Sequence, residues 1–332
     1  MSSEEPSGTN APVVVLGVSR SGTTLLKEML DRHSKLAIPS ESYFIPQLWD
    51  RHGPRPDREA ILADLGRLAR IREWGVSLDD VRGRLPVEGS FADVIAAVYR
   101  THADAQGKTR FGDKTPAYMQ YLELLERAFP GAQYVHIVRD GRDAALSFVA
   151  MRRRPRFNWA RPRRLGDFAC QWDFEVRAAR RFGATVAAGR YLELRYENLV
   201  ADPDLHLRGI CSFLGLRFEP EMLEYHDGLD ATTLQDHPRL AQPPTTGLRD
   251  WREQMSPREV ELFEAIAGPL LAELGYPRAY SAPSRAVRVR GAGERALFVA
   301  RLTSWRAGLA LVRRSPAWRL RQVYIRRAET SS

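Results

Sequence analysis

Residues 17–26, GVSRSGTTLL, have the spacing of a phosphate-binding loop, with glycines at 17 and 22 and a threonine at 24. Thr23 stands where nucleotide triphosphatases with such a loop carry a lysine. A turn of Ser, Gly and Thr at the start of a helix directs backbone N–H groups and a partial positive charge at one point, which favours binding of a phosphate or another oxyanion. A tight turn that only joins a strand to a helix is the alternative. Further donors are available from the side chains of Arg20, Ser21, Thr23 and Thr24.

Two more cations have positions from which they would reach a bound anion. Lys114, in FGDKTP, precedes a proline that begins a helix, and it is one of only four lysines in the chain. Arg139 follows the apolar run QYVHIV (133–138), and Ser147 lies two helical turns further on. An arginine at the carboxyl end of a parallel strand lies at the crevice where α/β sheets bind ligands. The alternatives are an ordinary surface lysine and an arginine that pairs with the aspartates after it to fix the turn.

The elements around these residues alternate between apolar strands and helices. PVVVLG (12–17) and QYVHIV (133–138) are apolar runs typical of strands buried on both faces, and residues 190–199 contain a third strand. Apolar residues at helical spacing follow the first strand and recur over 118–129. We therefore predict an α/β fold with a central, mainly parallel sheet flanked by helices.

Composition divides the chain into a lead-in, a body and a tail. MSSEEPSGTNAP is acidic and rich in small residues, which predicts a disordered lead-in over 1–11 rather than a cleaved secretion signal. The body is predicted over 12–280, with a helical insertion at 53–110, and no apolar run reaches the roughly eighteen residues of a spanning helix. The two cysteines, Cys170 and Cys211, are too few for a disulfide framework or a zinc set, and their apolar neighbours favour burial. We therefore expect a cytoplasmic protein.

The net charge of +9 is concentrated in the tail, residues 281–332. Twelve arginines and two glutamates give this segment a net charge of +10, so the rest of the chain carries −1. Because the body adds no basic patch, we do not expect nucleic-acid binding. Within 294–314, apolar residues recur at helical steps among arginines, at Phe298, Leu302, Trp305, Leu309 and Val312. Such a basic amphipathic helical tail suits an anionic membrane surface, and packing on the body or on a second subunit is the alternative.

Three stretches in this order, SRSGTTLL, GDKTP and YVHIVRDGRDAALSF, resemble the sulfotransferase superfamily that uses 3′-phosphoadenosine 5′-phosphosulfate (PAPS). The resemblance covers residues 12–275 and is nearest to the branch of tyrosylprotein sulfotransferases and their bacterial relatives. It implies a P-loop-like three-layer fold and in-line transfer of a sulfuryl group from PAPS to an acceptor hydroxyl. Such a donor has no γ-phosphate, which accounts for the missing lysine.

The resemblance also implies roles for individual residues. The loop would cradle the 5′-phosphosulfate through Arg20, Ser21, Gly22, Thr23 and Thr24. Arg139 and Ser147 would hold the 3′-phosphate, and Tyr196, in RYENLV, would contact the nucleotide. Lys114 would support the transferred sulfuryl group.

The general base implied by this branch is a glutamate soon after the first helix, and Glu41, in IPSESYFIPQL, stands at that place. Ser40 departs from the relatives, which carry a second glutamate there. His33 and His136 are the rivals, since other branches use a histidine; their positions are more typical of a helix cap and a packed strand residue. A loop that closes over the nucleotide is expected within 243–255.

Two other classes of function compete with this interpretation. A P-loop kinase or triphosphatase would carry a lysine at position 23, and a non-catalytic membrane or partner adaptor would have no need of the Arg139 and Ser147 pair. No cluster of metal-ligand residues is visible, so no metal is expected. The sequence leaves open the class of the hydroxyl-bearing acceptor and the oligomeric state.

Overall fold

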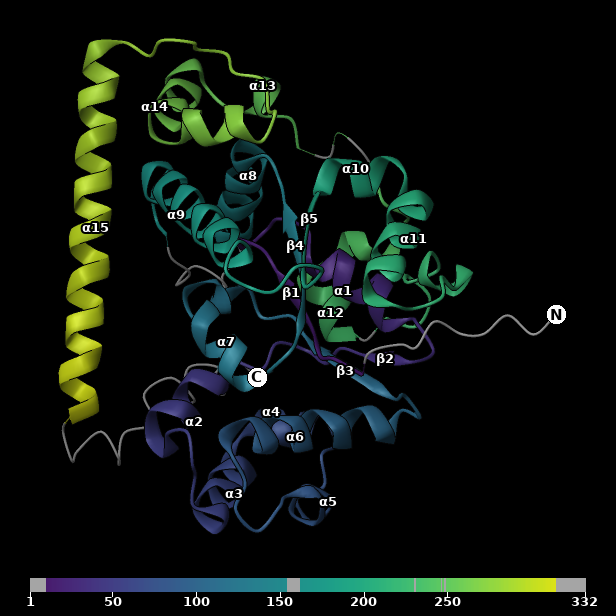
Figure 1. The fold of residues 1–332 in the computed structure, drawn as a ribbon. Helices are drawn as coiled ribbons and strands as arrows, with labels where there is room; N and C mark the ends of the chain where they lie inside the picture. The colour runs from purple at the N-terminus through teal and green to yellow at the C-terminus, as the bar shows by residue number, and fades with distance from the viewer. Residues whose placement is uncertain (1–9, 154–161, 230, 246, 248, 315–332) are drawn as a thin grey trace. The chain divides into compact units, whose positions relative to one another are not determined.

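The computed structural model describes residues 10–153, 162–229, 231–245, 247 and 249–314 (Figure 1). The chain divides into two compact units. We call residues 1–139 with 179–246 the sheet unit, and residues 140–178 with 247–332 the helical unit. Residue 280, the predicted end of the body, lies inside the helical unit.

The sheet unit contains five parallel strands in the order β2-β3-β1-β4-β5. The strands are β1 Val13–Leu16, β2 Leu36–Ala37, β3 Arg110–Asp113, β4 Gln133–Val138 and β5 Tyr191–Arg195. Every residue of β1 and β4 is buried, as expected of central strands covered on both faces. The predicted α/β class with a parallel sheet is therefore confirmed, and β2 and β3 are strands that the apolar pattern did not predict.

Helices connect these strands and flank the sheet. The helices of the sheet unit are α1 Thr23–Asp31, α2 Ile45–His52, α3 Arg58–Arg67, α4 Ala69–Glu73, α5 Leu78–Arg84, α6 Phe91–Ala105, α7 Leu122–Ala128, α10 Tyr196–Ala201, α11 Pro203–Leu214 and α12 Ala231–Asp236. The segment predicted as a helical insertion thus contains helices α3 to α6. The helix predicted over 118–129 is divided at Tyr121, whose φ of −131° and ψ of 32° end a short 3₁₀ segment before α7 begins.

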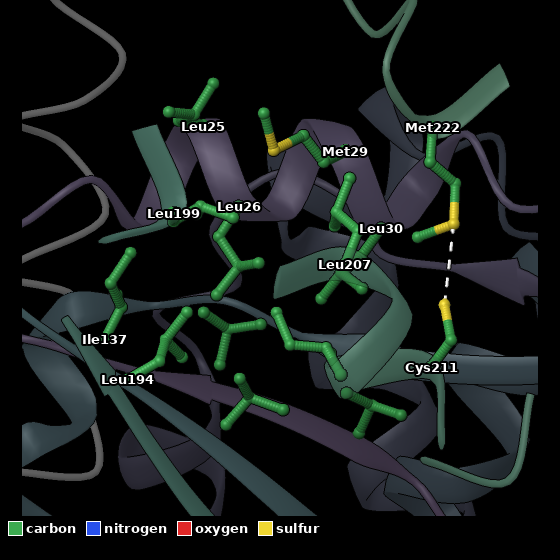
Figure 2. Packing of buried hydrophobic residues seen from close by; sticks show 14 of the residues in the cluster. Leu25, Leu26, Met29, Leu30, Ile137, Leu194, Leu199, Leu207, Cys211 and Met222 are labelled. Atoms are coloured by element: carbon green, nitrogen blue, oxygen red, sulfur yellow. Dashed lines mark hydrogen bonds between the residues drawn. The ribbon is translucent and has the colours of Figure 1, made fainter. Parts of the chain in front are cut away.

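The core of the sheet unit fills the face of the sheet under α1, α10 and α11 (Figure 2). Alternate residues of the central strands point to this face and meet apolar side chains of the helices, among them Val13, Val15, Val135, Ile137, Leu26, Leu30, Leu199 and Leu207. Cys211 of α11 lies in this core with its sulfur 3.7 Å from that of Met222, and burial raises the pKa of its thiol to about 12. Cys170, in the helical unit, is also buried, so the predicted burial of both cysteines is confirmed.

The helical unit is organised around a buried arginine. Its helices are α8 Gly141–Arg152, most of α9 Leu165–Gly183, α13 Trp251–Gln254, α14 Pro257–Glu273 and α15 Arg285–Arg314. Arg142 is fully buried; its guanidinium donates to Asp140 at 2.7 Å and to Glu264 at 2.6 Å, and lies 3.6 Å from the ring centre of Trp251. Paired in this way, the charge is compensated inside the unit.

The first part of the predicted tail forms α15 and packs on its own unit. Arg295 donates to the carbonyl oxygen of Ile266, the rings of Phe298 and Phe174 lie 5.9 Å apart, and Arg301 pairs with Asp167 at 2.8 Å. The side chains of Trp305, Leu309 and Val312 and all of residues 315–332 lie outside the described part of the chain. No helix among the described residues is both long enough and apolar enough to cross a membrane.

Candidate active site

The carboxyl ends of all five parallel strands supply the candidate residues of the sheet unit. Parallel strands end at the same edge of a sheet, which is where open α/β sheets bind ligands. In sheet order, β2 leads to Glu41, β3 to Lys114, β1 to the loop 17–22, β4 to Arg139 and β5 to Tyr196. Residues that are far apart in the sequence are therefore brought to one edge by the topology.

The loop between β1 and α1 presents an uncapped helix N-terminus. Arg20 and Gly22 have φ angles of 74° and 94°, and the Ser21 amide donates to the carbonyl oxygen of Val18 at 3.0 Å. Gly22 is the N-cap of α1, no side chain caps it, and the first turn holds no acidic residue. The backbone N–H groups and the positive end of the helix dipole are therefore available to an anion.

Gly22 also permits a close approach that no other residue would allow. A Cβ atom at this position would lie 2.3 Å from Cδ2 of Tyr196, and the φ of 94° is strained for any side chain. Beside it, the hydroxyl oxygen of Ser21 is buried and has no hydrogen-bond partner among the described residues. A buried hydroxyl without a partner is costly, so its presence in this loop fits a ligand oxygen.

Two arginines and a tyrosine lie together on the β4 and β5 side of the loop. The guanidinium of Arg139 lies 4.5 Å from the ring centre of Tyr196 and donates to the carbonyl oxygen of Arg20 at 3.4 Å. The Arg20 guanidinium donates to Nδ1 of His237 at 3.5 Å, a contact that no sequence motif indicates. Burial raises the pKa of Tyr196, so its hydroxyl stays protonated. Ser147, the predicted partner of Arg139, lies on α8 of the helical unit.

Lys114 connects the candidate base to the loop. Its ammonium donates to Oε1 of Glu41 at 2.6 Å and to Oγ1 of Thr24 at 3.3 Å. The side chain of Lys114 is only 5% exposed, whereas that of Glu41 is 25% exposed and so remains accessible to a ligand. The other carboxylate oxygen of Glu41 accepts a hydrogen bond from the hydroxyl of Tyr43, a residue that belongs to no predicted motif.

A buried polar network fixes the backbone on both sides of this ion pair. Asp113, next to Lys114, accepts hydrogen bonds from the hydroxyls of Ser42 at 2.9 Å, Tyr99 at 2.6 Å and Thr115 at 3.2 Å. Ser42, next to Glu41, also has its hydroxyl 2.7 Å from that of Tyr118. Burial raises the pKa of Asp113 to about 6, although these hydrogen bonds oppose the shift. The network ties the segment that contains Glu41 to the segment that contains Lys114.

Ser40, on the other side of Glu41, is also fixed by hydrogen bonds. Its hydroxyl accepts hydrogen bonds from Nε1 of Trp74 at 2.9 Å and from Arg70 at 3.3 Å. Ser40, which stands where the resemblance implies a glutamate, therefore anchors the loop to the helical segment 69–74. With Ser40 and Ser42 both tied down, Glu41 between them faces Lys114.

The rival histidines are both buried, and each makes a structural contact. His33 is buried; its Nε2 donates to the carbonyl oxygen of Arg217 at 2.9 Å and its Nδ1 accepts from the Lys35 amide at 3.0 Å. His136 is fully buried within β4, with Nδ1 2.6 Å from the hydroxyl of Tyr191. These contacts favour Glu41 as the base.

Two further predictions concern a closing loop and a metal site. The predicted closing loop, 243–255, belongs to both units and includes positions outside the described residues. Its Trp251 is buried in the helical unit, and its amide donates to Asp143 at 2.9 Å. Within the described residues, no three His, Cys, Asp or Glu side chains form a group that would hold a metal ion.

Comparison with known proteins agrees with this geometry. The sequence model described as "Sulfotransferase family" matches residues 12–220, well over half of the chain. The chain belongs to the sulfotransferase family. It is therefore an enzyme of sulfuryl transfer, and its α/β fold is that of the family.

Curated relatives in this family include enzymes named for tyrosine sulfation. A "Putative protein-tyrosine sulfotransferase" of Caenorhabditis briggsae is 24% identical over 281 residues, covering 82% of this chain and 91% of that protein. "Protein-tyrosine sulfotransferase 1" of Danio rerio is 25% identical over 279 residues, covering 80% and 72%. Among solved structures, the "Sulfotransferase Domain from the Synechococcus PCC 7002 Olefin Synthase" is 28% identical with a TM-score of 0.54, covering 85% of this chain and 100% of that domain.

Proposed function

We propose that the chain transfers the sulfuryl group of PAPS to an acceptor hydroxyl, with Glu41 as the general base. The observation that carries the proposal is the position of Lys114, whose ammonium contacts both Glu41, at 2.6 Å, and Thr24 of the loop, at 3.3 Å. A group bound at the loop would thus lie within reach of both the lysine and the base. The parallel sheet supports the proposal because it collects these residues at one edge.

The loop and its neighbours fit the phosphosulfate end of such a donor. The open N-terminus of α1 supplies backbone N–H groups, and the buried hydroxyl of Ser21 supplies a donor that has no partner among the described residues. Arg20 and Arg139 supply positive charge beside the loop, and Tyr196 stacks on Arg139. The role of Ser147 at the 3′-phosphate is proposed from the sequence resemblance alone.

Each residue near the reacting group then has a distinct task. Sulfuryl transfer, like phosphoryl transfer, has a loose transition state, so catalysis depends on position and charge more than on covalent help. Glu41 would take the proton from the acceptor hydroxyl as it attacks. Lys114 and Arg20 would offset negative charge on the sulfuryl oxygens and on the departing phosphate. The buried Asp113 network would hold Glu41 and Lys114 in place for this.

For the acceptor we propose a hydroxyl compound, with a tyrosine side chain as the first one to test. Both quoted relatives are named as protein-tyrosine sulfotransferases, which supports a phenolic hydroxyl. The partly exposed carboxylate of Glu41 would be accessible to an acceptor arriving from solvent. PAPS turnover should therefore be measured first with a tyrosine-containing peptide.

Calorimetry with 3′,5′-adenosine bisphosphate (PAP), the desulfated donor, tests the proposal directly. Wild-type protein should bind PAP more tightly than ATP, and Arg139→Ala should weaken PAP binding, because Arg139 would hold the 3′-phosphate. Glu41→Gln should bind PAP as the wild type does while losing about 10²–10⁴-fold in turnover, the usual contribution of a general base. Equal or tighter binding of ATP would refute the assignment of the donor, and unchanged turnover of Glu41→Gln would refute the assignment of the base.

A further inference from the structure

Tyr43 combines three properties that are unusual in an ordinary loop residue. Its φ of 56° lies in the left-handed region, which an aromatic residue adopts only at a cost in free energy. Its side chain is 47% exposed, and its hydroxyl donates a hydrogen bond to Glu41. Strained backbone of this kind concentrates at functional sites, where the surrounding contacts hold it.

The surrounding contacts are visible on both sides of Tyr43. Before it, the Ser42 amide donates to Oγ1 of Thr115 at 3.0 Å, and the Ser42 hydroxyl joins the buried network of Asp113. After it, the Ile45 amide donates to the hydroxyl of Tyr118 at 3.1 Å. The chain is thus fixed at both ends of a short segment, which leaves the ring of Tyr43 directed at the carboxylate of Glu41.

The hydroxyl of Tyr43 has the hydrogen bond that an acceptor hydroxyl needs. One oxygen of Glu41 accepts from Tyr43, and the other accepts from Lys114, which in turn contacts Thr24 of the phosphate-binding loop. The Tyr43 hydroxyl, the Glu41 carboxylate and the Lys114 ammonium are therefore linked by successive contacts, and the last of them reaches Thr24. A general base must contact the proton that it removes, and this contact is already made.

We propose that Tyr43 is a self-sulfation site: with PAPS bound and no acceptor present, the enzyme transfers the sulfuryl group to its own Tyr43 hydroxyl. This inference rests on the proposed function. The phenolic oxygen forms a bond to sulfur as the bond between sulfur and the 5′-phosphate oxygen breaks, PAP leaves, and the phenolic proton passes to Glu41. The product, a tyrosine O-sulfate, is accommodated because the side chain is half exposed. Each chain accepts a single group in this way.

The other tyrosines of the sheet unit near these residues do not share this position. The side chains of Tyr99 and Tyr118 are 0% and 2% exposed and their hydroxyls are bound within the network of Asp113 and Ser42. Tyr196 lies against Gly22 and under the guanidinium of Arg139. A sulfate group on Tyr99 or Tyr118 would have to be buried, and no hydrogen bond joins Tyr196 to Glu41 in the described part of the chain. Modification should therefore map to Tyr43.

The test needs only purified protein and PAPS. Protein is incubated with PAPS without acceptor, and intact mass followed by peptide mapping reports the addition of one SO₃ group and its position. We expect the group on Tyr43 of the wild type, none on Tyr43→Phe, and formation slowed by about 10²–10⁴-fold in Glu41→Gln. Tyr43→Phe should bind PAP as the wild type does, because Tyr43 contacts the base and not the loop.

The outcomes separate this inference from the function on which it rests. If PAP binds tightly but Tyr43 stays unmodified, the self-sulfation inference is overturned while the sulfotransferase assignment of the donor stands. If PAP does not bind, the proposed function itself fails. A mixture of two variants tests whether the reaction stays within one chain. The Lys114→Ala chain keeps Tyr43 and lacks the lysine, whereas the Tyr43→Phe chain keeps the lysine and lacks the acceptor. An SO₃ group on Tyr43 of the Lys114→Ala chain would overturn transfer within the same molecule.

Discussion

Asp113→Asn should change how the stability of the protein depends on pH. Asp113 is buried, and burial raises its pKa from 3.8 to about 6. A carboxyl group whose pKa is higher in the folded state contributes stability that is present below the unfolded pKa and lost as the pH rises through the folded pKa. Asparagine has nearly the same shape, and its carbonyl oxygen can accept the hydrogen bonds that Ser42, Tyr99 and Thr115 donate, but it has no proton to lose.

The size of the effect follows from the pKa shift. A shift of one unit corresponds to about 1.4 kcal/mol, so the full change for Asp113 is about 3 kcal/mol, of which about 2 kcal/mol falls between pH ~4.5 and ~7.5. The free energy of unfolding of the wild type should fall by that amount over this pH range because Asp113 ionises, whereas the variant has no such contribution. The new amide also places an N–H₂ group where Oδ1 of Asp113 has no partner among the described residues, which costs about 1–3 kcal/mol at every pH.

Urea unfolding of both proteins across this pH range measures the difference. The free energy of unfolding of the variant minus that of the wild type should rise by about 2 kcal/mol from pH ~4.5 to ~7.5, whatever its constant offset. Glu88→Gln, at an exposed turn, is the control, and its difference should stay flat. A flat difference for Asp113→Asn would show that the buried carboxyl is already ionised throughout, and the reasoning from burial would be refuted.

Three further changes test the loop, the lysine and the tail. Gly22→Ala should lose PAP binding because its Cβ would lie 2.3 Å from Tyr196. Gly107→Ala, at a φ of 68° after the end of α6 and with nothing within 4 Å, is also strained at positive φ but meets no clash, and it should bind PAP normally. Lys114→Ala should keep PAP binding but lose turnover, whereas the control Lys35→Ala, at an exposed lysine, should keep both. Equal turnover of the two variants would contradict the proposed role of Lys114 at the sulfuryl group. Truncation after residue 314 removes four arginines and should abolish flotation with anionic vesicles while PAP binding is kept, and unchanged flotation would reject membrane docking through this segment.

The central strands could be predicted because their apolar composition indicates burial on both faces. β1 and β4 consist mostly of apolar residues, and the structure places them in the middle of the sheet. β3 was not predicted because its sequence, RFGD, begins and ends with charged residues. Nothing within this segment indicates that those charges would be buried. The guanidinium of Arg110 donates to the carbonyl oxygens of Ala11 at 2.6 Å and Leu214 at 2.7 Å, so its burial depends on partners about a hundred positions away.

The same distinction separates the site residues that were predicted from those that were missed. The loop, Lys114 and Glu41 belong to short motifs that a sequence displays directly. Tyr43 and His237 belong to no motif and become relevant only through contacts with Glu41 and Arg20. The one available signal for Tyr43 was its position two residues after the candidate base, and nothing in the sequence indicates its left-handed backbone.

The placement of Glu41, the proposed base, depends on the smallest element of the fold. β2 has two residues, and its register with β3 pairs Leu36 with Arg110 and Ala37 with Phe111. Glu41 follows Ala37 by four positions and Lys114 follows Phe111 by three, so this pairing brings the two side chains level beyond the ends of their strands. A slip of one residue would turn the alternating side chains of β2 to the opposite faces and separate the pair. So short a strand cannot fix its own register. Contacts outside the strand fix its register. Asp31, at the end of α1, accepts a hydrogen bond from the Ile38 amide at 2.8 Å, and the Asp113 network holds Ser42. The distance between Glu41 and Lys114 is therefore set by buried polar contacts, and substitutions in those contacts should impair turnover more than they impair donor binding.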